Sequence, residues 1–224
     1  MRLIGHELFN KVQNLPLSTE QAAILIGQWW HPLHYFPTFL GRCVSVLPDI
    51  ESKSAIARIL NQEAGEGDPI RAHERIYVDS MERAGFTRGQ TTDAQPYPET
   101  IKLVDGYERA SKSRFPALGF LFATEVADLT MVSGIGVAVE RATGTTDIEW
   151  VNIHVQQEPD HVGQVDNTMQ ITFNEEEEAR VMSSAEEMWR LWIAFFDRLD
   201  KEIFGRPSHI DLITQNDSDV MAVG

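Results

Sequence analysis

Apolar residues recur at the helical period along most of this 224-residue sequence, and proline and glycine fall mainly between the periodic segments. Runs that alternate between apolar and polar residues are few. The pattern therefore predicts an all-α protein, a bundle of about seven helices. A chain of this length is expected to form one domain, over residues 1–205, followed by a polar tail over 206–224. The expected helices span approximately residues 19–46, 54–63, 68–84, 99–111, 116–141, 148–165 and 175–203.

Prolines and capping residues refine the boundaries of these helices. Pro32 and Pro37 predict a kink or a break inside the first helix, because proline lacks the N–H group of a helical hydrogen bond. Asp68 is expected to cap a helix whose first residue is Pro69. The threonine-rich stretch 87–98 is expected to be a loop.

Charge and cysteine content exclude several classes of function. Lysine and arginine number 19 against 34 aspartates and glutamates, so the formal net charge of -15 would repel nucleic-acid phosphates. Cys43 is the only cysteine, which excludes an intrachain disulfide and a cysteine-rich zinc site and fits a reducing compartment. Neither a signal-peptide core nor an uncharged apolar run of about 18 residues is found. We therefore expect a cytoplasmic protein with no nucleic-acid or membrane partner.

The segment His154-Val-Gln-Gln-Glu158-Pro-Asp-His161 is the most distinctive local motif. At about 100° per helical residue, His154, Glu158 and His161 share one face, where two imidazoles and a carboxylate could bind a metal ion. The alternative is an ordinary solvated face. Pro159 complicates the metal interpretation, because it should kink the helix between the two histidines.

Glu125 is an acidic residue within an apolar helical segment. Its neighbours at i-4, i-3 and i+4 are Leu121, Phe122 and Leu129, so the carboxylate is expected to face the core. Glutamate is rarely buried without a partner or a metal ion. A salt bridge or a neutral buried acid is the alternative to a metal ligand.

Glu63 and His73 flank a glycine-rich turn between two predicted helices. The turn could bring the two side chains to one point, although a surface histidine after an ordinary turn is the alternative. Taken together, the three segments supply carboxylates and imidazoles and no sulfur, a donor set that suits iron or manganese in the core of a helical bundle. The six candidate metal ligands are Glu63, His73, Glu125, His154, Glu158 and His161.

These residues resemble the motifs of the haem-oxygenase-like diiron oxidases, the metal-binding branch of the superfamily that includes TenA-type thiaminases and the PQQ-synthesis oxidase. The family pattern has a glutamate and a histidine around a Gly-Asp-Pro turn, a lone glutamate after Leu-Gly in an apolar helix, and His-x3-Asp-x2-His in a later helix. The chain matches these in order as Glu63 to His73, Leu118-Gly-Phe-Leu-Phe-Ala-Thr-Glu125 and His154 to His161. The likeness extends from about residue 17 to 204.

The resemblance implies a haem-oxygenase-like fold, two Fe(II) ions and O2 as co-substrate, with Glu125 as the bridging carboxylate and no catalytic residues beyond the metal ligands. It also implies oxidation of a small carboxylate-bearing metabolite. An amino acid with an apolar or aromatic side chain is favoured, with C–C cleavage, N-oxygenation or nitrile formation as the outcome. Oxidative decarboxylation of a fatty acid is the alternative within the family. A homodimer is left open.

The chain departs from the family pattern at two places. Glu158 replaces the aspartate, so the ligand at this point is either Glu158 or Asp160. Some members have a further carboxylate just before a Phe-Pro pair in the first core helix, whereas here no acid occurs between Glu20 and Asp49. We therefore expect one of the two ions to be held more weakly.

Residues one turn from the candidate ligands are expected to line a substrate pocket, with ordinary core packing as the alternative. These residues are Leu121, Phe122 and Trp150, and His34 and Tyr35 in the first long helix are expected to line the pocket with them. Two other functions remain open. A metal-free TenA-like hydrolase would use Cys43 as its nucleophile, and a haem- or ligand-binding helical protein would use a single axial histidine.

Overall fold

Nine α-helices and one 3₁₀ turn make up the described part of the chain, residues 3–169 and 173–205 of a computed structural model, and no strand occurs there. For residues 158–162, 164 and 166–169 only the backbone is described. The predicted tail 206–224 lies outside the described residues. The helices are α1 (Glu7–Asn14), α2 (Thr19–Val46), α3 (Ile50–Glu63), the 3₁₀ turn η1 (Pro69–Arg71), α4 (His73–Arg83), α5 (Arg88–Thr92), α6 (Pro98–Ala110), α7 (Arg114–Thr143), α8 (Glu149–Met169) and α9 (Glu175–Phe204).

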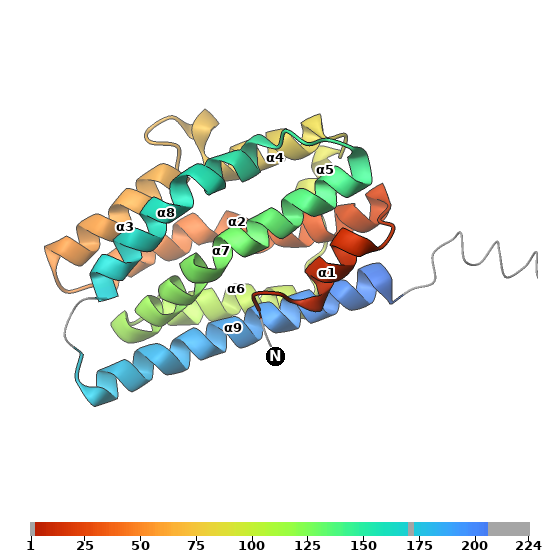
Figure 1. Ribbon diagram of the computed structural model, residues 1–224. Helices are drawn as coiled ribbons and strands as arrows, with labels where there is room; N and C mark the ends of the chain where they lie inside the picture. The colour runs from red at the N-terminus through yellow and green to blue at the C-terminus, as the bar shows by residue number, and fades with distance from the viewer. Residues whose placement is uncertain (1–2, 170–172, 206–224) are drawn as a thin grey trace, which may run out of the picture.

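Helix α7 is the central element of the bundle. It packs against α1, α2, α6, α8 and α9, and Figure 1 shows it crossing the middle of the molecule between α8 and α9. By length and composition α7 could also cross a membrane, but more than half of its most apolar window is buried inside the fold. Its apolar surface is therefore accounted for by contact with the surrounding helices.

A close approach between α7 and α9 depends on Gly119. A Cβ atom added to Gly119 would lie 2.3 Å from the backbone oxygen of Val181 and 2.8 Å from the Cβ of Ser184. Glycine is the residue that allows two helix backbones to come this near. This contact fixes the distance between the two longest helices, whose inner faces line the central cavity of the bundle.

The expected all-α fold is confirmed, and the differences concern short elements. The prediction of about seven helices missed α1 and α5. Helix α5 lies in the stretch that was expected to be a loop, where Thr87 and Gln90 form a capping box at its start. Five and eight residues are too few to show a convincing apolar period.

Two further predictions about helix boundaries differ from the structure in part, namely a break at Pro32 or Pro37 and a helix that begins at Pro69. Helix α2 continues through Pro32 and Pro37 without interruption, because packing of its buried face outweighs the loss of single helical hydrogen bonds. Asp68 does cap Pro69, accepting a hydrogen bond from the N–H of Ile70 at 3.0 Å, but Pro69 begins only the 3₁₀ turn η1. Helix α4 begins after this turn, at His73.

Candidate metal centre

The turn between α3 and α4 brings Glu63 and His73 together. Glu63 is the last residue of α3 and His73 is the first residue of α4. Between them Gly65, Glu66 and Gly67 all have positive φ, which reverses the chain within a few residues. Both side chains are buried, and Nδ1 of His73 lies 3.0 Å from Oε1 of Glu63. The two atoms are not aligned as a hydrogen bond, so they resemble two donor atoms directed at a common point.

His154, from the second turn of α8, completes this cluster. Its Nδ1–H donates to the backbone oxygen of Trp150 at 2.7 Å. A carbonyl only accepts, so the proton must be on Nδ1, and Nε2 keeps the lone pair that a metal ion would bind. One ligand atom from each of Glu63, His73 and His154 lies within 4.8 Å of the other two. All three residues are no more than 5% exposed.

Helices α4 and α8, which carry the two histidines, are joined directly. The Oγ of Ser80 in α4 accepts a hydrogen bond from the N–H of Trp150 at 3.1 Å. The Trp150 ring also packs edge to face on Tyr77, one turn before Ser80. Tyr77 in turn donates from its hydroxyl to the backbone oxygen of Ile26 in α2 at 2.8 Å. These contacts join the second half of α4 to the first turn of α8.

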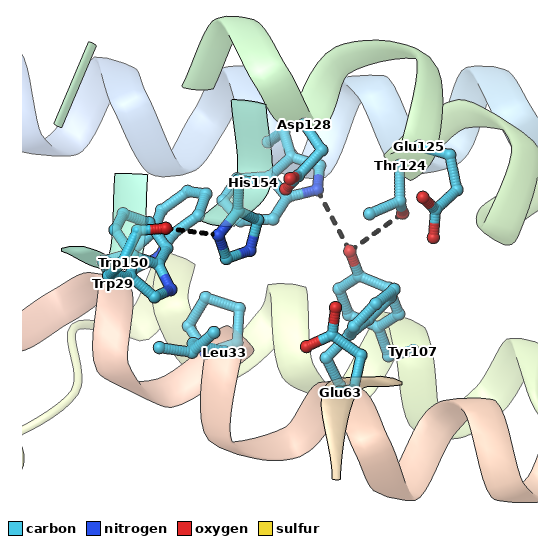
Figure 2. A pocket seen from close by; sticks show the side chains of 12 residues that line it. Trp29, Leu33, Glu63, Tyr107, Thr124, Glu125, Asp128, Trp150 and His154 are labelled. Atoms are coloured by element: carbon cyan, nitrogen blue, oxygen red, sulfur yellow. Dashed lines mark hydrogen bonds between the residues drawn. The ribbon is translucent and has the colours of Figure 1, made fainter. Parts of the chain in front are cut away.

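A cavity of about 30 Å³, enough for one or two water molecules, lies beside this cluster. Figure 2 shows Trp29 and Trp150 at one end of the lining, the carboxylates of Glu63 and Glu125 toward the other end, and the His154 ring between them. The polar lining consists of Glu63, Tyr107, Thr124, Glu125, Asp128 and His154, and the apolar lining of Trp29, Pro32, Leu33, Phe36, Trp150 and Trp192.

A chain of hydrogen bonds runs along one wall of the cavity, from the Trp192 indole to the carbonyl of Phe120. The indole N–H of Trp192 donates to the Tyr107 hydroxyl at 3.3 Å, and the Thr124 hydroxyl donates to the carbonyl of Phe120 at 2.8 Å. The Tyr107 hydroxyl lies 2.9 Å from that of Thr124 and must be the donor between them. Because burial raises the pKa of Tyr107, its phenol stays neutral. Its hydrogen bonds to Trp192 and Thr124 hold the ring in place in the cavity wall.

The structure brings four of the six predicted ligands to one cavity. Glu63, His73 and His154 come together, and Glu125 lines the same cavity. The side chains of Glu158, Asp160 and His161 lie outside the described residues, so their roles stay predictions.

Of the residues expected to line a pocket, Trp150 lies on the cavity and the other four lie elsewhere. Leu121 is fully buried core and Phe122 packs against the core. His34 is 61% exposed and lies 2.7 Å from Glu74, and Tyr35 donates to Glu108.

Asp128 is a cavity residue that the sequence motifs did not reveal. It lies three residues after Glu125 in α7 and lines the cavity with it. The i, i+3 spacing of two acids in an apolar segment could have revealed it, because such residues share one helix face.

Charge at the site is dominated by carboxylates. Burial lowers the pKa of His73, but the negative charges of Glu63 and Asp128 and the Gln157 side chain outweigh burial, so the pKa is raised overall. The surroundings of His73 therefore favour a positive charge at its ring. A proton supplies this charge when no metal ion is bound.

The residues present fit an iron site. A ligand atom lies about 2.0–2.2 Å from a bound first-row ion, so two ligands of one ion are at most about 4.4 Å apart. One ligand atom from each of Glu63, His73 and His154 lies within 4.8 Å of the other two, a spacing compatible with one shared ion. Carboxylate and imidazole donors without sulfur are those that iron accepts.

Cys43 does not belong to this site. It is 1% exposed, and burial raises the pKa of its thiol. It is not among the residues that line the cavity, so the structure offers no support for a cysteine nucleophile there.

Comparison with known proteins identifies the family of this chain. The sequence model of a family described as iron-containing redox enzymes matches residues 24–193. The chain belongs to this family. The matched range includes every candidate ligand of this iron-containing redox enzyme, from Glu63 to His161. None of the curated proteins matches the sequence significantly.

Solved structures similar to this member of the iron-containing redox enzymes share its fold at low sequence identity. A CADD-like protein of unknown function from Nostoc punctiforme superposes with a TM-score of 0.75, 14% identity and 90% coverage of both chains. A domain with a heme oxygenase-like fold from Shewanella denitrificans gives 0.73 and 16%, covering 89% of this chain and 86% of its own. A TenA homologue from Pseudomonas syringae pv. tomato gives 0.70 and 14%, with coverage of 89% and 86%. The fold is therefore heme oxygenase-like.

Proposed function

We propose that this protein is a non-haem diiron oxidoreductase that uses O2 to oxidise a small amino acid or a related small carboxylate. The proposal is carried by one observation: Glu63, His73 and His154 are buried and lie close together. Beside them is a cavity that two carboxylates of α7 also line. Bound ferrous ions would supply the reduction of O2.

The protein's own residues have three tasks in such a reaction. Glu63, His73 and His154 would hold one ion, and Glu125, with the predicted ligands Glu158 and His161, would hold the second. The Ser80 contact keeps the two histidine-bearing helices at a fixed distance. The indole and phenyl rings around the cavity exclude bulk water from the reacting atoms.

The cavity lining supports a small substrate with an apolar side chain. Aromatic and aliphatic side chains form half of the lining, which favours an apolar side chain on the substrate. No lysine or arginine is among the lining residues that the structure describes. A substrate carboxylate would therefore be matched by a bound metal ion or by neutral hydrogen-bond donors.

Two such donors are present. Trp29 and Trp150 are 3% and 1% exposed, and within the described part of the chain neither indole N–H has a hydrogen-bond acceptor. Both rings line the cavity (Figure 2). A buried donor without an acceptor costs about 1–3 kcal/mol, and a substrate carboxylate would remove that cost.

The proposal is tested in two steps. Ferrous iron is first titrated into metal-free protein without O2, and binding of two ions per chain is expected, the second more weakly. Iron-loaded protein is then incubated under O2 with pools of apolar and aromatic amino acids and, separately, of fatty acids. Iron- and substrate-dependent O2 uptake with loss of an amino acid is expected. Absence of ferrous binding, or preferential tight binding of zinc under all conditions, would contradict the proposal.

Replacing Trp29 by phenylalanine is expected to weaken substrate binding. A six-membered aromatic ring is retained, but the pyrrole ring and its N–H are lost, so the KM for the amino acid found in the screen should rise about 3- to 10-fold, the value of one hydrogen bond. The free energy of unfolding should fall by roughly 1 kcal/mol or more, because the smaller ring leaves a cavity in the core. Steady-state O2 uptake and thermal unfolding measure the two quantities.

Trp189 offers the matched control, since its indole N–H donates to the backbone oxygen of Ala123 at 3.1 Å and its ring is away from the cavity lining. Trp189→Phe removes the same atoms from the side chain, so it should also lower stability, and it should leave KM unchanged. An unchanged KM in Trp29→Phe would show that the Trp29 N–H does not bind substrate.

A further inference from the structure

Helices α3 and α7 contribute three carboxylates to the cavity, one more than the sequence motifs predicted from these helices. Glu63 comes from α3, and α7 contributes both Glu125 and Asp128. Glu125 is 3% exposed and Asp128 is half-buried. Figure 2 shows both α7 carboxylates extending from the helix on the side of the cavity.

The helix geometry makes Glu125 and Asp128 a pair. Residues three apart lie about 60° from each other around a helix and one turn apart along it. Two carboxylates so placed can bind the same ion, as pairs of ligands at this spacing do in other helical metal sites. The residues between them, Val126 and Ala127, do not line the cavity.

Among the residues that the structure describes, the other helices add no carboxylate to the cavity lining. The α2 wall of the cavity is made of Trp29, Pro32, Leu33 and Phe36, and α2 contributes no carboxylate to it. His73 and His154 lie with Glu63 in one cluster whose ligand atoms are within 4.8 Å of one another, a cluster that does not include the α7 carboxylates. The α7 pair therefore marks a second position in the same cavity.

Charge balance points the same way. Three carboxylates line a cavity of about 30 Å³ whose described lining has no lysine or arginine. Such a carboxylate-rich lining favours cations, and bound metal ions would supply positive charge beside the imidazole of His73. Two ferrous ions bring four positive charges, which Glu63, Glu125, Asp128 and the predicted ligand Glu158 would neutralise.

We propose that Asp128 is a metal ligand, and that it holds the second ferrous ion together with Glu125. This inference rests on the proposed diiron function. It assigns to α7 the additional carboxylate that α2 lacks, and it makes the second ion depend on a residue outside the three sequence motifs.

Anaerobic ferrous iron titration of the full-length protein tests the inference, with wild type, Asp128→Asn and Glu140→Gln compared. Glu140 is an exposed acid on the same helix and serves as the matched control. In Asp128→Asn the first ion should bind as in wild type and the second at least tenfold more weakly. Glu140→Gln should bind both ions as wild type does.

Thermal unfolding of the iron-free proteins separates a ligand from a structural partner. Asparagine has the size of aspartate, so if Asp128 acts as a ligand, Asp128→Asn should be about as stable as wild type without iron. Two results overturn the inference: unchanged binding of the second ion, or weaker iron binding that accompanies an equal loss of iron-free stability. If wild type binds two ions and only the Asp128 result fails, the proposed function stands; if wild type binds none, both fail.

Discussion

Replacing Gly65 by alanine is expected to lower the free energy of unfolding by about 3 kcal/mol or more and to weaken ferrous iron binding at the same time. Gly65 has a φ of +86°, a conformation that costs a residue with a Cβ about 1–2 kcal/mol. The added Cβ would also lie 2.1 Å from the backbone oxygen of Asp68 and 2.6 Å from the backbone nitrogen of Ala72. Backbone atoms cannot rotate away, so the turn itself must move.

Movement of this turn changes the distance between Glu63 and His73, which it joins. Metal sites tolerate deviations of only about 0.2 Å in ligand distance, so affinity should fall together with stability. Denaturant unfolding of the iron-free protein and anaerobic iron titration measure the two effects.

Gly67 provides a matched control within the same turn. Its φ is +92°, but an added Cβ would meet nothing within 4 Å. Gly67→Ala should therefore cost only about 1–2 kcal/mol and leave iron affinity close to wild type. Equal effects of the two substitutions would show that the close contacts of Gly65 do not position the site.

Substitution of His154 by alanine is expected to reduce ferrous iron affinity by more than about 100-fold. Even outer-shell partners of metal ligands contribute about 10- to 100-fold to affinity, and His154 is predicted to bind the ion directly. The iron-free protein should remain folded, because the Nδ1–H contact to Trp150 stays within α8 itself. Added imidazole should restore part of the affinity by occupying the space left by the ring.

His34→Ala is the control for this substitution. His34 lies on α2, is 61% exposed and lies 2.7 Å from Glu74 at the surface. Iron affinity in His34→Ala should equal that of wild type. If both histidine variants bound iron normally, the cluster of Glu63, His73 and His154 would not be the metal site.

Periodicity predicted the long helices well because each one buries a continuous stripe. The buried stripe of α9, for example, includes Met188, Trp192 and Phe195, which are spaced by three or four residues. Helices α1 and α5 are too short for such a stripe to be recognised. The prolines of α2 suggested a break because local hydrogen bonding was weighed without the tertiary packing that keeps the helix continuous.

Sequence spacing predicted the convergence of Glu63 and His73 because a short turn leaves two helix ends few ways to separate. It could not predict that His154 would meet them, since that depends on contacts between helices far apart in sequence. The Ser80 to Trp150 hydrogen bond, which links positions 70 residues apart, is one such contact.

The choice of cavity face on α2 shows a further limit of sequence reasoning. Trp29, Pro32, Leu33 and Phe36 lie within roughly 100° of arc and form the cavity wall, whereas position 34 lies about 140° from Trp29. Both arcs contain aromatic residues, so composition alone did not distinguish the inner face from the outer one.

The hydrogen bond between α4 and α8 makes the dynamics of the site measurable at one backbone proton. The Trp150 amide lies in the first turn of α8, where it has no carbonyl partner within its own helix, and Ser80 is its acceptor. Its exchange with deuterated solvent therefore requires the two helices to separate locally. Slow exchange in iron-free protein means that His73 and His154 are held ready before an ion arrives, whereas fast exchange means that the ion itself closes the site.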